Sequence, residues 1–276
     1  MSALDDLEPA LAAAPGTVSV WHGGLTGPPR YTRLPEDTHY AASTMKAAVL
    51  VAAHRAAAAG DADLDAPVGV HADFASGDGE TRFTAGEEED GDDQAWARLG
   101  EDVPLRWLLR RMIVRSGNLA TNLVIEHLGF DAVAEAWRAC GARHSRVARL
   151  LGDAAADLRA KRNLVTAADL AAVMRAIATD AAATPAACAE MRELLEANEF
   201  NPDIPAGLPP GTRVAHKNGW VTGTRHDAAL VTPDDAPPYV LVVCTTTELS
   251  DDDACALVAR VATASWPDRL RAAQVS

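Results

Sequence analysis

Apolar residues follow two different spacings along the chain, and these spacings divide it into strand-forming ends and a helix-forming middle. Near the N-terminus, β-branched and aromatic residues gather at Thr17–Trp21 and Tyr31–Leu34, with a hairpin turn expected at His22-Gly23-Gly24. Three comparable stretches follow near the C-terminus: Thr212–Trp220, Asp227–Thr232 and Tyr239–Thr246. Because strands that succeed one another through short turns pair antiparallel, these segments predict an antiparallel sheet built from both ends of the chain.

Helical spacing, with apolar residues at i, i+3 and i+4, dominates the rest of the chain. The clearest case is Ser43–Ala59, an alanine-rich apolar run that ends at Gly60. The other segments with this pattern are residues 3–14, Pro104–Ser116, Leu119–Leu128, Phe130–Cys140, Ala167–Ala178, Ala186–Asn198 and Asp251–Ala264. Leu64–Phe83 is interrupted by Pro and Gly and is expected to be irregular. The whole pattern predicts an α+β fold, an antiparallel sheet flanked by helices plus an all-helical part inserted between its strands.

Composition excludes several classes of partner. The chain has 276 residues, which fits one large two-lobed domain, and its net charge is 25 − 39 = −14. Such an acidic protein repels phosphate groups, so neither nucleic acid nor an anionic membrane is an expected partner. The acidic run Glu87–Asp93 is expected to be a solvated loop.

The sequence carries no sign of a membrane span, an export signal or a metal site. No apolar run approaches the roughly 18 residues that a span needs. Met1–Asp6 is acidic, whereas a secretory signal begins with basic residues, so we expect a cytoplasmic protein unless a signal has been removed. The cysteines Cys140, Cys188, Cys244 and Cys255 form no CxxC pair and no zinc-ligand spacing, which predicts reduced thiols and no metal.

Ser43 and Lys46 are the first candidates for chemistry. They stand three residues apart at the start of the alanine-rich run, so both side chains fall on one face of a helix. A lysine can activate a serine hydroxyl when burial or a nearby cation lowers the pKa of its amine. The alternative is that Ser43 is only the N-cap of the helix.

Two further motifs lie far from the first. Ser116-Gly117-Asn118 separates two predicted helices and could provide a second hydroxyl and an amide, or be only a turn and a cap. Lys217-Asn218-Gly219 lies within an otherwise apolar strand. Gly219 would let a substrate approach the backbone as an added strand, whereas the alternative for Lys217 is a solvent-facing position at a sheet edge.

In this order, Ser-x-x-Lys, Ser-x-Asn and Lys-x-Gly resemble the motifs of the class A β-lactamase and penicillin-binding protein superfamily. The segments Met112–Leu123 and Gly223–Asp227 are similar to that family around its second and third motifs, and the resemblance extends from about Thr17 to about Arg260. It implies one β-lactamase-like domain over residues 1–276. The α/β lobe would comprise residues 1–62 and 207–276, and the all-α lobe residues 63–206.

The resemblance also implies a role for each matching residue. Ser43 is expected to be the acylated nucleophile, Lys46 its general base or part of a proton relay, and Ser116 the group that passes the proton to the leaving nitrogen. Lys217 would supply positive charge and help to orient Ser116. Asn118 would bind an amide of the substrate.

Further positions would bind the substrate and its oxyanion. The backbone N–H groups of Ser43 and Trp220 would form the oxyanion hole, beside the close approach allowed by Gly219. Asn218, which replaces the usual hydroxyl residue, and Arg225 would contact a substrate carboxylate.

The chain departs from the family's motifs at the point that matters for deacylation. The family's Ω-loop carries a glutamate that activates water, but the corresponding stretch Arg146–Asn163 contains none. Arg149 and Asn163 are expected to close the loop, and Asp153 is the nearest carboxylate. In addition, Gly117 replaces the aspartate of the second motif. An acyl-enzyme is therefore expected to form and then to hydrolyse slowly.

The favoured hypothesis is a cofactor-free, monomeric serine hydrolase that acts on a small amide or ester bearing a carboxylate, β-lactams included. The alternatives are a non-catalytic or slowly acylating penicillin-binding or scaffold protein, and an esterase or D-Ala-D-Ala peptidase-like enzyme. His226-Asp227 raises a further alternative, a Ser-His-Asp triad, which we disfavour because Lys46 already supplies a base.

Overall fold

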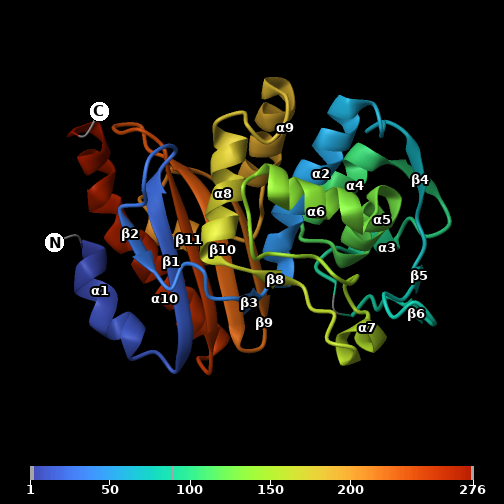
Figure 1. The fold of residues 1–276 in the computed structure, drawn as a ribbon, viewed down its shortest axis with the longest axis horizontal. Coiled ribbons are helices and arrows are strands. Elements are labelled where there is room, and N and C mark those ends of the chain that lie inside the picture. The colour runs from blue at the N-terminus through green and yellow to red at the C-terminus, as the bar shows by residue number, and fades with distance from the viewer. Residues whose placement is uncertain (1–2, 89, 275–276) are drawn as a thin grey trace.

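A five-stranded antiparallel sheet forms the centre of the protein in a computed structural model that describes residues 3–88 and 90–274 (Figure 1). The strand order is β2-β1-β11-β10-β9. The strands are β1 (Gly16–Gly24), β2 (Tyr31–Arg33), β9 (Arg213–Val221), β10 (Thr224–Thr232) and β11 (Tyr239–Thr247). Gly16 pairs with Thr247 and Gly24 with Tyr239, so both ends of the chain build one sheet, as the sequence predicts.

Both faces of the sheet are covered, which explains the unbroken apolar run of β11. Tyr239, Leu241 and Val243 belong to one core, and the residues between them point to the other, because side chains alternate along a strand. The first core lies under α1 (Ala3–Ala12), α10 (Asp251–Ser265) and the 3₁₀ turn η2 (Ile204–Gly207), and η3 (Trp266–Gln274) follows α10.

The opposite face of the sheet packs on α8, and beyond it lie the remaining helices (Figure 1). The buried helix α2 (Lys46–Ala59) contacts α4, α5, α6, α8 and α9. Its alanine-rich sequence fits a helix enclosed by packing. The other helices here are α3 (Asp93–Trp96), α4 (Leu105–Val114), α5 (Asn118–Leu128), α6 (Phe130–Ala139), α7 (Ala154–Leu158), α8 (Ala167–Ala178) and α9 (Pro185–Glu196).

Short strand pairs tie the loops together. They are β3 (His39–Tyr40) with β8 (Leu164–Val165), β4 (Pro67–Gly69) with β7 (Asp102–Pro104), and β5 (Asp73–Ala75) with β6 (Arg82–Thr84). The segment expected to be irregular therefore contains strand. The hairpin turn expected at His22–Gly24 is also wrong, because β1 continues through Gly24 and His22 is buried against Tyr239.

The predicted α+β class is confirmed, with helices on both sides of an antiparallel sheet. Across the described residues, no helix has the length and apolar character that a membrane crossing requires.

Candidate active site

Ser43 lies in a 3₁₀ turn, η1 (Ala42–Met45), immediately before α2. Its neighbours Ala42 and Thr44 are buried, whereas Ser43 itself is only half-buried. Ala42 has a φ of 44°, a left-handed conformation that a non-glycine residue adopts only when its surroundings impose it. No side chain caps η1 or α2, so the interpretation of Ser43 as a plain N-cap is wrong.

Lys46 is wholly buried at the first turn of α2, and its amine connects the first motif to the second. Its Nζ donates to the Ser116 carbonyl at 2.5 Å and to Asn118 Oδ1 at 2.9 Å, and lies 3.3 Å from Ser116 Oγ. Burial, reinforced by the charge of Lys217, lowers the pKa of Lys46 well below its ordinary value, while Asp90 opposes the shift. Lys46 is therefore suited to accept a proton.

The turn that carries Ser116 holds an unusual backbone conformation. Ser116 has a φ of 56° and is buried between α4 and α5. In this conformation both its carbonyl and its hydroxyl meet the amine of Lys46. Among the bonds of the described residues, no lysine amine donates to the Ser43 hydroxyl, so the expected transfer from Ser43 to Lys46 stays a prediction.

Lys217 is the second buried amine of the site. Its Nζ donates to the Asn218 carbonyl at 2.7 Å, and within the part of the chain described here it makes no hydrogen bond to Ser116. The expected orientation of Ser116 by Lys217 therefore stays a prediction. Burial lowers the pKa of Lys217 to about 7, against the opposing effect of Asp227 and Asp203. The interpretation of Lys217 as a solvent-facing lysine is wrong, because the residue is fully buried.

Gly219 brings the third motif against the first. A Cβ atom at this position would lie 2.4 Å from the Ser43 backbone nitrogen and 2.9 Å from that of Thr44. Only glycine permits this approach. Because β9 is the edge strand of the sheet, alternate backbone groups around Trp220 face away from β10. The N–H groups of Ser43 and Trp220, the predicted oxyanion donors, thus belong to two segments in direct contact.

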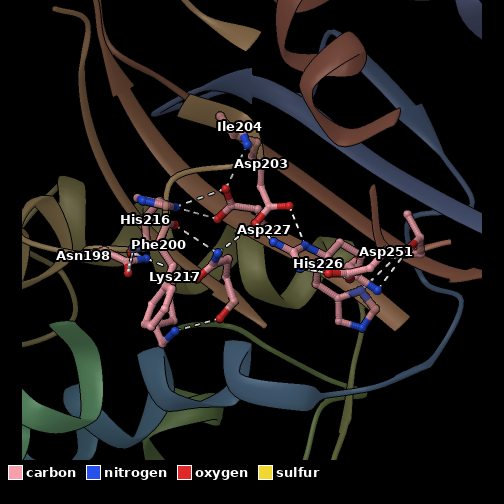
Figure 2. A network of polar contacts seen from close by, with 12 residues as sticks. Asn198, Phe200, Asp203, Ile204, His216, Lys217, His226, Asp227 and Asp251 are labelled. Atoms are coloured by element: carbon pink, nitrogen blue, oxygen red, sulfur yellow. Dashed lines mark hydrogen bonds and ion pairs between the residues drawn. The ribbon is translucent and has the colours of Figure 1, made fainter. Parts of the chain in front are cut away.

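Asn218 is buried, and its side chain bonds to the polar network whose members Asn198, Phe200 and Asp203 are labelled in Figure 2. Its Nδ2 donates to Asp203 at 2.8 Å and to the Phe200 carbonyl at 3.1 Å, and its Oδ1 accepts from Asn198 at 3.3 Å. Protein groups already satisfy both ends of this amide. The predicted contact of Asn218 with a substrate carboxylate requires one of these bonds to be exchanged.

Arg225 is also held by the protein itself. It is buried and donates two bonds to Asp203, at 2.7 and 3.0 Å, while its third nitrogen reaches Asp251 at 3.1 Å. Its guanidinium carbon stands 4.9 Å from the centre of the Trp220 ring. The predicted pairing of Arg225 with a substrate carboxylate therefore has two competitors in the structure.

The histidines of β9 and β10 exclude a Ser-His-Asp triad built on His226. The Nδ1 of His226 accepts from the Thr245 N–H at 3.0 Å, so its Nε2 carries the proton donated to the Tyr40 carbonyl at 2.8 Å. Burial lowers the pKa of His226 to about 4. Asp227 instead holds His216, at 2.9 Å. His226 therefore has no nitrogen left to serve as a base.

The loop over residues 146–163 closes as predicted through Arg149 and Asn163. Asn163 Oδ1 accepts from the Arg149 N–H at 3.1 Å, and its Nδ2 donates to the Arg149 carbonyl at 3.0 Å. Asn122 binds the loop to α5, since its amide pairs with the N–H of Leu151 at 2.8 Å and with its carbonyl at 2.9 Å. Asn122 lies one helical turn after Asn118, so Leu151 is held beside the motif residues.

Asp153, the nearest carboxylate of that loop by sequence, is fully buried and has a structural role. Its Oδ1 accepts from Ser76 at 2.8 Å and from the Ala156 N–H at 3.0 Å, and its Oδ2 accepts from the Gly77 N–H at 2.8 Å. These bonds cap α7 and tie the loop to the turn between β5 and β6. With both oxygens engaged, Asp153 is not placed to activate water.

The prediction of a solvated loop for Glu87–Asp93 is wrong for Asp90 and Asp92, whereas the other described residues of this run are exposed; Glu89 lies outside the described residues. Asp90 accepts from the backbone N–H groups of Asn118 and Leu119, at 2.8 and 2.7 Å, and so caps α5. Asp92 is completely buried against Arg111 and caps α3. The local signal is an aspartate at the N-cap of the short helix α3, but the partner Arg111 is distant in sequence.

Nothing in residues 3–88 and 90–274 groups three His, Cys, Asp or Glu side chains closely enough to hold a metal ion. The site contains the half-buried serine Ser43 and the buried amine of Lys46, whose lowered pKa favours its neutral form. The Ser116 hydroxyl lies within hydrogen-bond distance of that amine, and the buried amine of Lys217 is close enough to influence its charge. Such a set can transfer an acyl group without a cofactor.

Comparison with known proteins gives a matching family and several structures of similar fold. A model of the beta-lactamase enzyme family matches residues 2–267. No curated protein matches the sequence. The solved structure of PBP-A is similar over 98% of this chain and 96% of its own, with a TM-score of 0.82 and 19% identity.

Two β-lactamase structures are similar to the same extent. The β-lactamase of Sphaerobacter thermophilus has a TM-score of 0.81 and 23% identity, over 98% of this chain and 97% of its own. An ancestral class A β-lactamase, that of the last common ancestor of Gram-negative bacteria, has a TM-score of 0.81 and 24% identity, over 96% of this chain and 99% of its own. At these identities the likeness is one of fold.

Proposed function

This chain belongs to the beta-lactamase enzyme family, and we propose that it is a serine hydrolase whose Ser43 is acylated by β-lactams or by other small amides and esters bearing a carboxylate, and whose acyl-enzyme hydrolyses slowly. The observation that carries the proposal is the bonding of Lys46 to both Ser116 and Asn118 beside the contact of Gly219 with Ser43.

The proposed acylation begins at Lys46. Its neutral amine takes the proton of the Ser43 hydroxyl, and Ser43 Oγ forms a bond to the substrate carbonyl carbon. The N–H groups of Ser43 and Trp220 stabilise the negative charge that develops on the carbonyl oxygen. The carbon–nitrogen bond then breaks, and the proton passes from Lys46 through the Ser116 hydroxyl, 3.3 Å away, to the leaving nitrogen.

Two further residues bind the substrate in this proposal. Asn118 holds a substrate amide while its Oδ1 accepts from Lys46. Lys217 supplies a positive charge near the substrate carboxylate when its amine is protonated.

Deacylation needs a water molecule and a base that accepts its proton. The Leu151 backbone is fixed to α5 by Asn122, and its aliphatic side chain accepts no proton. Asp153 is engaged elsewhere. A missing general base slows such a step by about 10² to 10⁴. PBP-A, similar in fold, has been captured in a leucine-to-glutamate variant as an acyl-enzyme with penicillin G, which makes penicillin G a suitable probe.

Intact-mass spectrometry after mixing with penicillin G, and separately with a fluorophosphonate, tests the proposal. We expect a persistent adduct on Ser43 with both reagents. Ser43→Ala should abolish both adducts while its melting temperature stays within a few degrees. Ser250→Ala, which removes only the N-cap of α10, is the matched control and should be labelled at the parent rate. A folded parent that forms neither adduct would overturn the proposal in favour of a non-catalytic binding protein.

A further inference from the structure

Gly117 has no side chain, and the side chain of Asp92 lies against the place that a side chain at position 117 would occupy. A Cβ atom added to Gly117 would lie 3.1 Å from Asp92 Cβ and 3.2 Å from Asp92 Oδ2. An aspartate at position 117 would therefore run into the side chain of Asp92. A carboxylate at position 117 and the carboxylate of Asp92 would therefore occupy the same place. In this chain Asp92, in the loop before α3, supplies the carboxylate.

We propose that Asp92 provides, from this separate loop, the carboxylate that the turn Ser116-Gly117-Asn118 lacks, and that it is a positioning residue for Ser116. The inference rests on the proposed function, because Ser116 is there the group that relays the proton. Asp92 itself touches no reacting atom; it acts through the backbone of the turn.

The partner of Asp92 connects it to the turn. Asp92 is fully buried, and its carboxylate accepts two bonds from Arg111 Nε, at 2.9 and 3.1 Å, and one from Nη2. The carbonyl of the same Arg111 accepts from the Gly117 N–H at 3.1 Å. Asp92 thus fixes Arg111 in the last turn of α4, and the carbonyl of Arg111 holds the Ser116 turn through the Gly117 N–H.

The conformation of Ser116 needs such support. Its φ of 56° is one that a residue with a side chain adopts only when its surroundings impose it. The Ser116 carbonyl and hydroxyl meet Lys46 only while this conformation holds, since both are attached to the same turn.

Asp90 supports the same turn from its other side. It caps α5 at the N–H groups of Asn118 and Leu119, and also accepts from the Asp92 N–H at 3.1 Å. The two aspartates therefore hold the end of α4 and the start of α5, with Ser116 between them.

The test measures the maximal rate constant of Ser43 acylation by penicillin G, whose leaving nitrogen takes the proton that Ser116 relays, together with the melting temperature. Asp92→Asn keeps the shape but removes the charge, and we expect acylation to slow by about tenfold or more. The double variant Asp92→Gly with Gly117→Asp returns a carboxylate to Arg111 from the turn itself, and should recover the parent rate to within about threefold.

Asp169→Asn is the matched control. Asp169 is another buried carboxylate, bound to the backbone N–H groups of residues 143–145 and not to the turn. Its loss should lower the melting temperature to a similar extent but leave acylation within about twofold of the parent.

Three results would overturn the inference while the proposed function stands. They are a folded Asp92→Asn protein acylated at the parent rate, a double variant that recovers stability but not rate, and equal rate losses in Asp92→Asn and Asp169→Asn. If Asp92→Asn does not fold, Gly117→Ala disturbs the contact between position 117 and Asp92. Acylation of that variant at the parent rate would likewise overturn the inference. A parent protein that is never acylated refutes the proposed function itself, which separates the two failures.

Discussion

Gly219 lies so close to Ser43 that a single methyl group on its Cα would stand 2.4 Å from the Ser43 backbone nitrogen. Strand β9 and the turn η1 come from distant parts of the chain, and this contact fixes their spacing. The spacing matters for chemistry because the two predicted oxyanion donors, on Ser43 and Trp220, belong to these two segments.

Gly219→Ala is therefore expected to damage catalysis more than stability. The methyl group forces β9 away from Ser43, and the loss of one aligned oxyanion donor slows acyl transfer by about 10² to 10³. The measurement is the rate of fluorophosphonate labelling, with the melting temperature recorded alongside. Gly86→Ala is the control, since a Cβ atom there meets no atom within 4 Å. Labelling of Gly219→Ala at the parent rate would contradict the assignment of the oxyanion hole.

Leu151→Glu is expected to create a base for deacylation. Asn122, one helical turn after Asn118, holds the Leu151 backbone at both its N–H and its carbonyl, so the new carboxylate would start from a fixed point. We expect hydrolysis of the penicillin G acyl-enzyme to accelerate by about 10². The measurement is the disappearance of the adduct mass after removal of free penicillin.

Two variants control that experiment. Leu151→Gln has nearly the same shape without a proton-accepting carboxylate, and Leu158→Glu adds the same charge at a side chain that is 90% exposed in the same loop. Neither should accelerate deacylation. If folded Leu151→Glu loses its adduct no faster than the parent, our account of the loop is wrong.

Sequence patterns were sufficient for the elements whose signal is local. The helical spacing of Phe130–Cys140 and the β-rich run Tyr239–Thr246 correspond to α6 and β11 within a residue or two. The Ser43–Lys46 pair is also local, and the structure keeps it at the start of a helix. That the three motifs meet came from a family resemblance, since spacing along the chain does not determine which segments pack together.

The features that the sequence did not predict depend on distant partners. A run of acidic residues normally stays solvated, yet Asp92 is buried because Arg111 faces it from α4. Asp153 has no local partner that the sequence reveals, because its donors Ser76 and Gly77 come from the turn between β5 and β6. In the same way, the family motif indicates Asn218 as a substrate ligand but does not reveal that its amide donates to Asp203, fifteen residues earlier.

The two buried amines predict a pH dependence that differs between substrates. Burial lowers the pKa of Lys217 to about 7, so its positive charge is present below that pH and is lost as the pH rises above it. The rate constant of acylation by a carboxylate-bearing penicillin, divided by that for a neutral ester, should therefore fall as the pH rises above about 7. The ratio cancels the titration of Lys46, because both substrates need the same base. Lys217→Arg keeps its charge in this range and should flatten the curve; a flat ratio in the parent would contradict the role of Lys217.

Arg225 supplies the last prediction, because its guanidinium is shared between buried Asp203 and the exposed Asp251. A substrate carboxylate has to compete with Asp251 for the same nitrogen, which Asp251 reaches at 3.1 Å. Asp251→Asn weakens that competitor, and we expect the concentration of penicillin G for half-maximal acylation to fall by about twofold to fivefold, as befits an ion pair open to solvent.

A neutral ester should show no such gain with Asp251→Asn, since it has no group for Arg225 to bind. Asp252→Asn removes the same charge from the same turn of α10 and is the matched control, because the bonds of Arg225 run to Asp203 and Asp251. If Asp252→Asn improves binding equally, the effect is one of general charge and Arg225 has no special part in it. If Asp251→Asn changes neither substrate, Arg225 serves to hold β10 to α10, and the substrate carboxylate depends on Lys217 alone.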